Sequence, residues 1–313
     1  MKQFLTLNDL PDFDAQVALA QHIKANPYEF EQLGKRKTLG LLFFNPSLRT
    51  RLSTQKAARL LGMDVMVMNF SNEAWAIEYE DATTMEGLRS EHVKEAAQVV
   101  SQYCDVVGIR AFATLTDKEK DESEQVLQKF IEYASVPILN MESATAHPLQ
   151  ALADALTLTE HDLPKKPKVV LTWAPHPKAL PHAVGNSFTR MMQHKNADFV
   201  IANPQGYDLD PRITKDIPII HNQNEALKDA DIVYAKNWSS YESYGQILRT
   251  DNEWMLTPEK MALTNNAKFM HCLPIRRNVV VADGVLDHPN SIVIEQANNR
   301  TFAAAAVLKT LIS

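Results

Sequence analysis

Short apolar runs rich in β-branched residues alternate with stretches of helical period along the chain, and this alternation restricts the fold most. Four runs lie in the first half, with helical stretches such as Glu95–Tyr103 between them: Leu39–Phe44, Val65–Met68, Val106–Ile109 and Val136–Leu139. The second half repeats the pattern, with a candidate return strand at its end: Val169–Trp173, Phe199–Ala202, Ile232–Ala235, Phe269–Leu273 and then Ser291–Ile294. Such alternation is typical of parallel sheets covered by helices. We therefore predict an α/β protein with buried strands.

Two domains are expected, because 313 residues exceed the usual size of one hydrophobic core. Apolar residues at helical spacing predict a helix that begins near Pro148 and crosses between the domains, and a second helix at the C-terminus. We predict a first domain over residues 1–147, with helix 297–313 packed back on it, and a second domain over residues 148–296. A cleft between two domains is a common place for a site.

The composition excludes several classes of protein. With 45% apolar residues and no apolar run of about 18 residues, the chain has no candidate membrane span. A net charge of -6 without a dense basic segment disfavours a nucleic-acid partner. Cys104 and Cys272 lie far apart and form no ligand spacing, so neither a metal site nor a disulfide framework is expected. The segment Met1–Gln16 has no long apolar run, and we expect a cytoplasmic protein.

A candidate anion site follows the first strand, where Ser47, Leu48, Arg49, Thr50 and Arg51 lead into a helical stretch. The first N–H groups of a helix and its dipole favour an anion, and hydroxyls and guanidiniums add charge-assisted hydrogen bonds. The sequence therefore predicts a phosphate site at this strand-to-helix turn. The alternative interpretation is that Ser47 only caps the helix and that the arginines are solvated.

This segment resembles the Ser-x-Arg-Thr-Arg signature with which aspartate and ornithine carbamoyltransferases bind carbamoyl phosphate. Three further motifs occur in the family's order: Arg110 at the end of a strand, His147-Pro148-Leu149-Gln150, and His271-Cys272-Leu273-Pro274. Open α/β sheets bind ligands at the carboxyl ends of their strands, and these motifs stand there or where the crossing helix begins. The resemblance spans nearly the whole chain. It implies two doubly wound parallel-sheet domains, of which the second is knotted.

The resemblance also implies roles for single residues, without a metal or a cofactor. One set would hold the phosphate group of carbamoyl phosphate: Ser47, the Leu48 backbone N–H, Arg49 and Thr50. A second set would point at the carbonyl oxygen: Thr50, Arg110 and His147. A third set would surround the carbamoyl NH₂ group: Gln150, the backbone carbonyls of Cys272 and Leu273, and Arg300. The residues expected to be catalytic are Arg49, Thr50, Arg110 and His147.

Each of these residues also has an ordinary structural interpretation. Arg110 alone is equally well a surface arginine, and His147 alone is a histidine beside a helix start. Cys272 has no Cys/His/Asn partners in the sequence, so a small buried thiol fits it better than a nucleophile. Trp75 alone is a core or interface aromatic. By resemblance, however, Trp75 would enter the site of a neighbouring subunit, which implies a homotrimer with shared sites.

The acceptor substrate is predicted from what is missing as well as from what is present. The Asp-x-x-x-Ser-Met-Gly stretch of ordinary ornithine carbamoyltransferases is absent. The stretches Thr172–Pro177 and Tyr234–Trp238 resemble instead the enzymes that act on N-acetyl- or N-succinylornithine. By that resemblance four residues line the acceptor pocket, unless they are solvated surface charges: Glu142, His176, Lys236 and Arg276. Lysine and arginine can pair with carboxylates.

Ser90 bears on the choice between the two acyl groups. In the acetylornithine enzymes a glutamate stands at this place and would repel a succinyl carboxylate, and the succinylornithine enzymes carry proline. Serine differs from both, but it is uncharged and leaves space. Arg276-Arg277-Asn278 is also followed by Val279-Val280 without the lysine of the acetyl enzymes. We predict N-succinylornithine as the acceptor, with N-acetylornithine as the alternative.

Two further alternatives belong to other functional classes. A nucleotide-binding dehydrogenase would also have two α/β domains, but none of the nine glycines forms a GxGxxG or GxxxxGK motif. A non-catalytic small-molecule binding protein on the same scaffold would be expected to have lost Arg49, Arg110, His147 or Gln150. All four are present.

Overall fold

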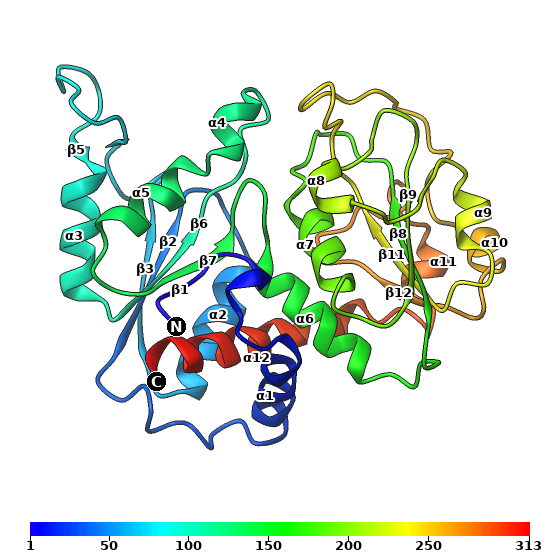
Figure 1. Ribbon diagram of the computed structural model, residues 1–313, viewed down its shortest axis with the longest axis horizontal. Coiled ribbons are helices and arrows are strands. Elements are labelled where there is room, and N and C mark those ends of the chain that lie inside the picture. Colours follow the sequence, from blue (N-terminus) through cyan, green and yellow to red (C-terminus); the bar gives the residue numbers. More distant parts are fainter. The chain divides into compact units, whose positions relative to one another are not determined.

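The computed structural model describes residues 1–313, and the chain divides into two compact units (Figure 1). Unit 1 comprises residues 1–114, 119–152 and 300–313, and unit 2 comprises residues 115–118 and 153–299. Each unit contains one five-stranded parallel sheet with helices, which confirms the predicted α/β class. The chain changes unit inside helix α6 (Pro148–Thr159) and again inside helix α12 (Val293–Ile312).

The sheet of unit 1 has the strand order β1-β7-β6-β2-β3. Its strands are β1 (Gln3–Phe4), β2 (Thr38–Phe43), β3 (Asp64–Asn69), β6 (Val106–Arg110) and β7 (Ile138–Glu142). The central strands β2 and β6 are buried along almost their whole length, as expected when helices cover both faces of a parallel sheet. The four predicted strands are present, and β1 was missed because two residues carry no periodicity.

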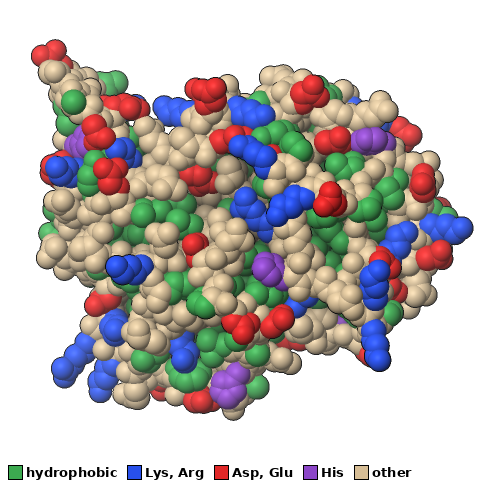
Figure 2. Space-filling model, in the orientation of Figure 1, with side chains coloured by type: hydrophobic (Ala, Val, Ile, Leu, Met, Phe, Trp, Pro, Cys, Tyr) green, Lys and Arg blue, Asp and Glu red, His purple; other side chains and the backbone are tan.

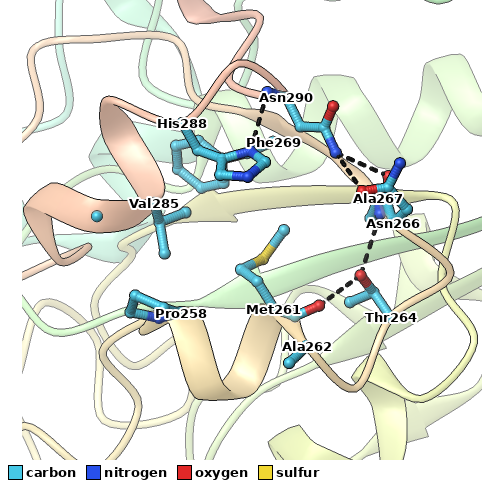
Figure 3. Close-up of a pocket in the computed structure, with 11 residues that line it drawn as sticks. Pro258, Met261, Ala262, Thr264, Asn266, Ala267, Phe269, Val285, His288 and Asn290 are labelled. Carbon is cyan, nitrogen blue, oxygen red and sulfur yellow. Dashed lines mark hydrogen bonds between the residues drawn. The ribbon is translucent and has the colours of Figure 1, made fainter.

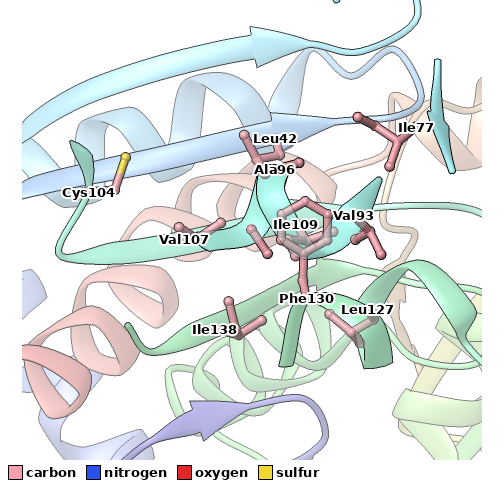
Figure 4. Close-up of a cluster of buried hydrophobic side chains, with 11 residues drawn as sticks. Leu42, Ile77, Val93, Ala96, Cys104, Val107, Ile109, Leu127, Phe130 and Ile138 are labelled. Carbon is pink, nitrogen blue, oxygen red and sulfur yellow. The ribbon is translucent and has the colours of Figure 1, made fainter. Parts of the chain in front are cut away.

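Helices cover both faces of this sheet (Figure 1). Apolar residues of α3 (Val93–Tyr103) and α5 (Gln125–Tyr133) pack on one face in the cluster that Figure 4 shows, around Phe130. Figure 1 shows the other face beside α1 (Phe13–Ala25), α2 (Arg49–Leu60) and α12. Short elements complete the unit: the 3-10 helix η1 (Leu7–Asp9), α4 (Lys118–Glu122), and a separate pair of strands, β4 (Ile77–Glu78) and β5 (Glu91–His92). Residues 300–313 belong to unit 1, the domain on which the sequence predicted the C-terminal helix to pack.

Two expectations for the strands of unit 1 need correction. Strand β3 was predicted to be buried, but it is an edge strand, on which Met66 is 55% and Met68 42% exposed. The last strand was predicted to begin at Val136 and begins at Ile138 instead. Pro137 has no N–H group to donate to a neighbouring strand, so regular pairing starts after it. A register shift where β7 pairs with β6 then brings Glu142 opposite Arg110.

The sheet of unit 2 has the order β10-β9-β8-β11-β12. Its strands are β8 (Lys168–Trp173), β9 (Asp198–Ala202), β10 (Ile219–Ile220), β11 (Ile232–Lys236) and β12 (Lys268–Met270). Its helices are α7 (Ala183–Met192), α8 (Pro211–Thr214), α9 (Gln223–Leu227), α10 (Pro258–Met261) and α11 (Asp283–Leu286). Figure 1 shows α7 and α8 on one side of the strands and α9 to α11 on the other.

Three details of unit 2 differ from the prediction. The short strand β10 was missed, and β12 ends at Met270 rather than at Leu273. Leu273 has φ +55°, which is incompatible with a strand. The prediction of a return strand at Ser291–Ile294 was wrong. Ser291 makes only one isolated bridge, to Phe269, before α12 begins at Val293.

The strand order of each sheet reverses once, and the reversal places the predicted site residues. In unit 1, β2 is followed along the chain by β3 on one side and by β6 on the other, so the switch point lies between β2 and β6. In unit 2 the corresponding point lies between β8 and β11. Ligands of open α/β sheets bind outside the carboxyl ends of the strands at such points. The two sheets therefore each supply one favoured binding position.

The exterior carries charges of both signs. On the face drawn in Figure 2, lysine and arginine side chains are interspersed with aspartate and glutamate. Interspersed charges of this kind do not form the basic stripe that nucleic-acid backbones require. None of the helices has the length and apolar character needed to cross a membrane.

Candidate active site

The switch point of unit 1 ends in a turn from strand β2 to helix α2. Leu48 is the N-cap residue of this helix, and there is no capping hydrogen bond from a side chain. The alternative in which Ser47 caps the helix therefore does not apply, because Ser47 lies one residue further out. The first N–H groups of α2 can thus meet an acceptor from a ligand, and the helix dipole favours an anion there.

Thr50, in the first turn of α2, is linked through Arg300 to Gln150. Nη2 of Arg300 donates to Oγ1 of Thr50 at 2.6 Å, and Nη1 of Arg300 donates to Oε1 of Gln150 at 3.1 Å. All three side chains are buried. The structure thus brings together three predicted site residues from α2, α6 and α12, with a guanidinium at their centre.

Arg110, the last residue of β6, is held beside the same turn. Its Nη1 donates to the backbone oxygens of Asn45 at 3.0 Å and Pro46 at 2.7 Å. Its Nη2 lies 3.2 Å from Oε2 of Glu142, which also lies 3.4 Å from Nε2 of His147. Glu142 was predicted to bind the acceptor, and the structure places its carboxylate on Arg110 and His147. Removing one partner from a buried ion pair typically costs about 3–5 kcal/mol.

Positive charge accumulates at this turn. Burial is the main cause that lowers the pKa of Arg110, and the nearby Glu142 carboxylate opposes this shift. The positive charge of Arg49 lowers the pKa of Arg110 further, so the two guanidiniums feel each other. Arginine stays protonated in proteins. An anion bound at the turn would relieve the mutual repulsion of these charges. Arg51 follows on the same helix and is half-buried.

Trp75 and Ser90 lie apart from this cluster, in the excursion that contains β4 and β5. Trp75 is 59% exposed, and its Nε1 donates to Oε2 of Glu91 at 2.7 Å. Ser90 is exposed, and its backbone N–H donates to the oxygen of Ala76 at 3.1 Å. Ser90 directly precedes β5 and Trp75 lies two residues before β4, and the parallel pairing of the two strands together with these two hydrogen bonds holds both residues in the same small region.

In unit 2, Lys236 ends strand β11 at the second switch point. Lys236 pairs with Trp173 at the end of β8, and both side chains are buried. Nζ of Lys236 donates to the oxygen of Asn237 at 2.8 Å, and Nδ2 of Asn237 donates to the oxygen of Ala174 at 2.7 Å. Asn237 thus ties together the two segments that follow β8 and β11. The ammonium of Lys236 lies at the strand ends, where it can pair with a carboxylate.

His176 lies three residues beyond β8 and accepts from Arg276. The distance from Nε of Arg276 to Nε2 of His176 is 3.2 Å, and Nδ1 of His176 lies 2.9 Å from the oxygen of Lys178. Partial burial is the main cause that lowers the pKa of His176, and the charges of Lys236 and Arg276 lower it further. A neutral ring with its proton on Nδ1 satisfies both contacts. Arg276 is exposed, so the structure brings these three predicted acceptor residues together at a partly open position.

Cys272 and Leu273 directly follow strand β12. The Cys272 thiol is buried, and Leu273 has a positive φ of +55°. A leucine in the left-handed region is uncommon, and such backbone positions concentrate at functional sites. The segment therefore turns sharply at the two residues whose backbone carbonyls the family resemblance assigns to the carbamoyl NH₂ group.

A cavity of about 390 Å³ lies elsewhere in unit 2, at α10, α11 and the edge strand β12 (Figure 3). Apolar side chains such as Met261, Phe269 and Val285 line it, and none of the predicted site residues does. Figure 3 shows Asn290 at its rim, where Nδ2 donates to Oδ1 of Asn266 at 2.7 Å. The cavity is thus separate from the strand ends that gather the predicted residues.

Several residues that shape the two clusters were missed by sequence reasoning. Glu91, which accepts a hydrogen bond from Trp75, was not singled out in the sequence. Asn237 was read only as part of a matching stretch, and Gln296 was not considered. Gln296 is fully buried and bonds to Asp154 at 2.7 Å. A buried amide inside an apolar helix is the signal that could have found it, because such groups require partners.

Comparison with known proteins gives two family matches, one after the other along the chain. Residues 2–160 match the carbamoyl-P binding domain of aspartate/ornithine carbamoyltransferase, and residues 182–311 match the Asp/Orn binding domain. An N-succinylornithine carbamoyltransferase of Bacteroides thetaiotaomicron is 48% identical, covering 100% of this chain and 99% of that protein. An N-acetylornithine carbamoyltransferase of Xanthomonas campestris is 39% identical, covering 100% of this chain and 98% of that protein.

The fold is also similar to that of solved structures. One is a crystal structure of a glutamate-to-serine variant of N-acetyl-L-ornithine transcarbamylase in complex with carbamyl phosphate and N-succinyl-L-norvaline. Its TM-score is 0.92 at 38% identity, and the alignment covers 99% of this chain and 100% of that chain. The likeness extends through both units.

Proposed function

The chain belongs to the aspartate/ornithine carbamoyltransferase family, and from this premise we propose that it transfers a carbamoyl group to the δ-amine of N²-succinyl-L-ornithine. The donor is carbamoyl phosphate, and the products are N-succinyl-L-citrulline and phosphate. The reaction would serve arginine biosynthesis in the cytoplasm. The observation that carries the proposal is the chain of Thr50, Arg300 and Gln150 beside the uncapped start of α2.

Unit 1 binds carbamoyl phosphate in this proposal. The phosphate group accepts from the first N–H groups of α2, from the hydroxyls of Ser47 and Thr50, and from Arg49. Arg110 and His147 donate to the carbonyl oxygen, and the carboxylate of Glu142 contacts both of them. Arg300 and Gln150 complete the site around the carbamoyl NH₂ group. These donors are held by other protein groups before substrate arrives, which avoids reorganisation during the reaction.

The reaction needs no covalent enzyme intermediate. The neutral δ-amine attacks the carbonyl carbon, a C–N bond forms, and negative charge develops on the carbonyl oxygen beside Arg110 and His147. The bond from carbon to the phosphate oxygen then breaks, and the leaving phosphate takes up the proton that the amine loses. Holding both reactants in place lowers the entropic part of the barrier, and donors at the oxyanion lower the electrostatic part.

Unit 2 binds the acylornithine. N-succinylornithine carries two carboxylates, and Lys236 and Arg276 offer two cations around His176. N-acetylornithine carries only one carboxylate and would leave one of these cations without a counter-charge. The backbone carbonyls of Cys272 and Leu273 accept from the carbamoyl NH₂ group. The higher identity to the succinylornithine relative, 48% against 39%, supports the same choice.

Ser90 is proposed to admit the succinyl group. It is exposed and uncharged, so it neither repels a carboxylate nor fills the space that a longer acyl chain needs. The related N-acetyl-L-ornithine transcarbamylase forms a complex with N-succinyl-L-norvaline as a glutamate-to-serine variant. That complex supports serine as compatible with a succinylated ligand.

A homotrimer with shared sites is part of the proposal. Exposed apolar side chains lie at the start of α2 and on the edge strand β3, and these two elements contact each other: Leu48, Leu52, Met66 and Met68. Exposed apolar groups of this size commonly mark protein–protein contacts, and an uncovered edge strand is a liability in a monomer. Trp75 is exposed in a neighbouring excursion, where a second subunit can receive it.

Steady-state assays with carbamoyl phosphate and either acylornithine test the proposal. We expect release of phosphate with formation of the carbamoylated product, and a higher kcat/KM for N-succinylornithine than for N-acetylornithine. A preference for N-acetylornithine would establish the alternative acceptor. Binding of carbamoyl phosphate without turnover of any acylornithine would instead support the non-catalytic alternative.

A further inference from the structure

A chain of buried hydrogen bonds runs through unit 2 behind the segment His271–Leu273. Nε2 of Gln296 donates to Oδ1 of Asp154 at 2.7 Å, and the backbone N–H of His271 donates to Oε1 of Gln296 at 2.9 Å. Asp154 and Gln296 are fully buried, and His271 is 4% exposed. We propose that Gln296 is a positioning residue that aims the carbonyls of Cys272 and Leu273 at the carbamoyl NH₂ group. This inference rests on the function proposed above.

The segment that Gln296 holds also has a hydrogen bond within itself. Nδ1 of His271 accepts from the backbone N–H of Leu273 at 2.8 Å, which closes a tight turn around Cys272. Leu273 stands at φ +55° in this turn, a conformation that costs an ordinary residue about 1–2 kcal/mol. A turn of this kind persists only when its surroundings determine it. The Gln296 contact to His271 supplies such a restraint.

The chemistry of the chain requires a carboxamide at position 296. An ionised Asp154 can only accept, and the backbone N–H of His271 can only donate. Gln296 must therefore donate with its nitrogen and accept with its oxygen, so its amide has one allowed orientation. Glutamate has no proton to donate to Asp154 and would face it as a second anion. A buried group left without its partner costs about 1–3 kcal/mol.

Tyr234 is buried in the same region, close to Asp154 and Cys272. Burial is the main cause that raises the pKa of Tyr234 well above its usual value, and the charge of Asp154 and the nearby Cys272 raise it further. The phenol therefore stays protonated at neutral pH.

Gln296 and Asp154 lie on the same helices as the carbamoyl-phosphate residues. Asp154 follows Gln150 by one helical turn on α6, and Gln296 precedes Arg300 by one turn on α12. Gln150 and Arg300 bond to each other, and so do Asp154 and Gln296. The helices α6 and α12 thus make two successive polar contacts with each other. The first joins Gln150 and Arg300, two of the proposed carbamoyl-phosphate residues, and the second, between Asp154 and Gln296, holds the turn after β12.

The consequence is selectivity for the NH₂ group of the donor. Carbonyl oxygens accept from an NH₂ group and gain nothing from a methyl group. Acetyl phosphate has the same phosphate and carbonyl as carbamoyl phosphate but carries a methyl in place of NH₂. A site built to bond a substrate NH₂ rejects the analogue that lacks it, because its acceptors are then left without donors. Gln296 should therefore affect the binding of carbamoyl phosphate and leave that of acetyl phosphate almost unchanged.

The test compares Gln296→Glu, Gln296→Met, Asp154→Asn and the double variant Asp154→Asn/Gln296→Glu. The double variant exchanges donor and acceptor: the amide introduced at position 154 donates to the new carboxylate at position 296, which still accepts from His271. Calorimetry with fresh carbamoyl phosphate and with acetyl phosphate gives a Kd for each, and the ratio of the two Kd values is the readout. Turnover of N-succinylornithine by the wild-type protein is measured separately and tests the proposed function alone.

We expect Gln296→Glu and Gln296→Met to raise the Kd for carbamoyl phosphate about tenfold and the Kd for acetyl phosphate by less than about threefold. The double variant should restore the ratio to within about threefold of wild type, and Asp154→Asn alone should change it little, because asparagine still accepts. Equal weakening of both ligands, or an unchanged ratio in every variant, would overturn the inference. If Gln296→Glu does not fold, Gln296→Met and the double variant decide the question in the same way. A wild-type protein that binds selectively without turnover would leave the inference standing and reject the proposed function.

Discussion

The two groups of predicted residues are built differently. In unit 1, Thr50, Arg110, His147, Gln150 and Arg300 are all buried, and hydrogen bonds or ion pairs link them to one another or to Glu142. In unit 2, Lys236 is buried, but His176 is half-buried and Arg276 is exposed, and a single hydrogen bond joins the last two. The first group is held throughout by contacts within the protein, whereas His176 and Arg276 have more room to adjust to a ligand.

The difference matches the chemistry that we assign to the two units. Carbamoyl phosphate is the substrate common to the whole family. Every member therefore needs the same hydrogen-bond donors at the developing oxyanion, and a rigid, buried set of residues provides them. An acceptor that differs between relatives needs a pocket whose cations can be moved or exchanged without disturbing the core. Affinity for such a ligand comes from a few charge-assisted hydrogen bonds that form on binding. The comparison predicts that substitutions in the buried group around Arg300 and Arg110 act on carbamoyl phosphate, and that substitutions of His176 and Arg276 act on the acylornithine.

The largest effect is expected from Arg49→Gln in unit 1. Loss of one preorganised cation at the phosphate should lower kcat/KM for carbamoyl phosphate about 10²–10³-fold, while the KM for N-succinylornithine changes little. Arg59→Gln is the matched control, because Arg59 is exposed near the end of the same helix. Steady-state kinetics with each substrate varied in turn measure both. A decrease shared equally by Arg49→Gln and Arg59→Gln would break the comparison.

A smaller effect on the other substrate is expected from Arg276→Gln in unit 2. One hydrogen bond to a charged group contributes about 1.5–3 kcal/mol, so the KM for N-succinylornithine should rise by about 10- to 100-fold. The KM for carbamoyl phosphate should change little. Its neighbour Arg277 is the control. Arg277 is exposed and paired with Asp283 and Asp287 at 2.8 and 2.7 Å, so Arg277→Gln should leave the KM unchanged. The opposite ranking of the two arginines would reject the assignment of Arg276.

The fold of both units was largely predictable from the sequence, because buried parallel strands such as β6 and β8 are continuous apolar runs. What the sequence could not reveal was exposure and pairing. Strand β3 has the same apolar character as its neighbours but lies at an edge, and only the strand order reveals this. The two-residue strands β1 and β10 exist through pairing with distant partners, so no local pattern marks them.

The candidate site was predictable where a motif stood at a strand end and less so where contacts are long-range. The segment Ser47–Arg51 was found from its position between a strand and a helix, and Arg110 was found from the family resemblance. The role of Glu142 as a partner of Arg110 depends on a register shift between β6 and β7, which no sequence pattern reports. Gln296 is joined to Asp154 across 142 residues, and only the folded chain brings the two together.

The expected effect of Ser90→Glu is more modest and changes selectivity rather than rate. A carboxylate at this exposed position would repel the succinyl carboxylate and leave an acetyl group unaffected. The ratio of kcat/KM values for the two acylornithines should fall about tenfold toward N-acetylornithine, since like charges at a partly solvated site cost about 1 kcal/mol or slightly more. Ser71→Glu, also exposed and located just after β3, controls for the added charge. Equal selectivity in both variants would remove Ser90 from the acceptor pocket.

The smallest effect concerns the protonation of His176, and it probes how open the acceptor group is. Partial burial is the main cause that lowers the pKa of His176 below the ordinary value of 6.5, and the charges of Lys236 and Arg276 add to this shift. A lowered pKa means that the ring takes up a proton at a lower pH than an isolated histidine does, so the contact with Arg276 persists to a lower pH. Histidine Cε1–H NMR signals, with His176→Gln for assignment, should give a midpoint below 6.5 in the wild type. Arg276→Gln should raise that midpoint, because one of the nearby positive charges is removed, whereas Arg277→Gln should not. A midpoint at or above 6.5 in the wild type would mean that solvent screens these charges. His176 and Arg276 would then be more accessible to solvent than the hydrogen bond between them suggests.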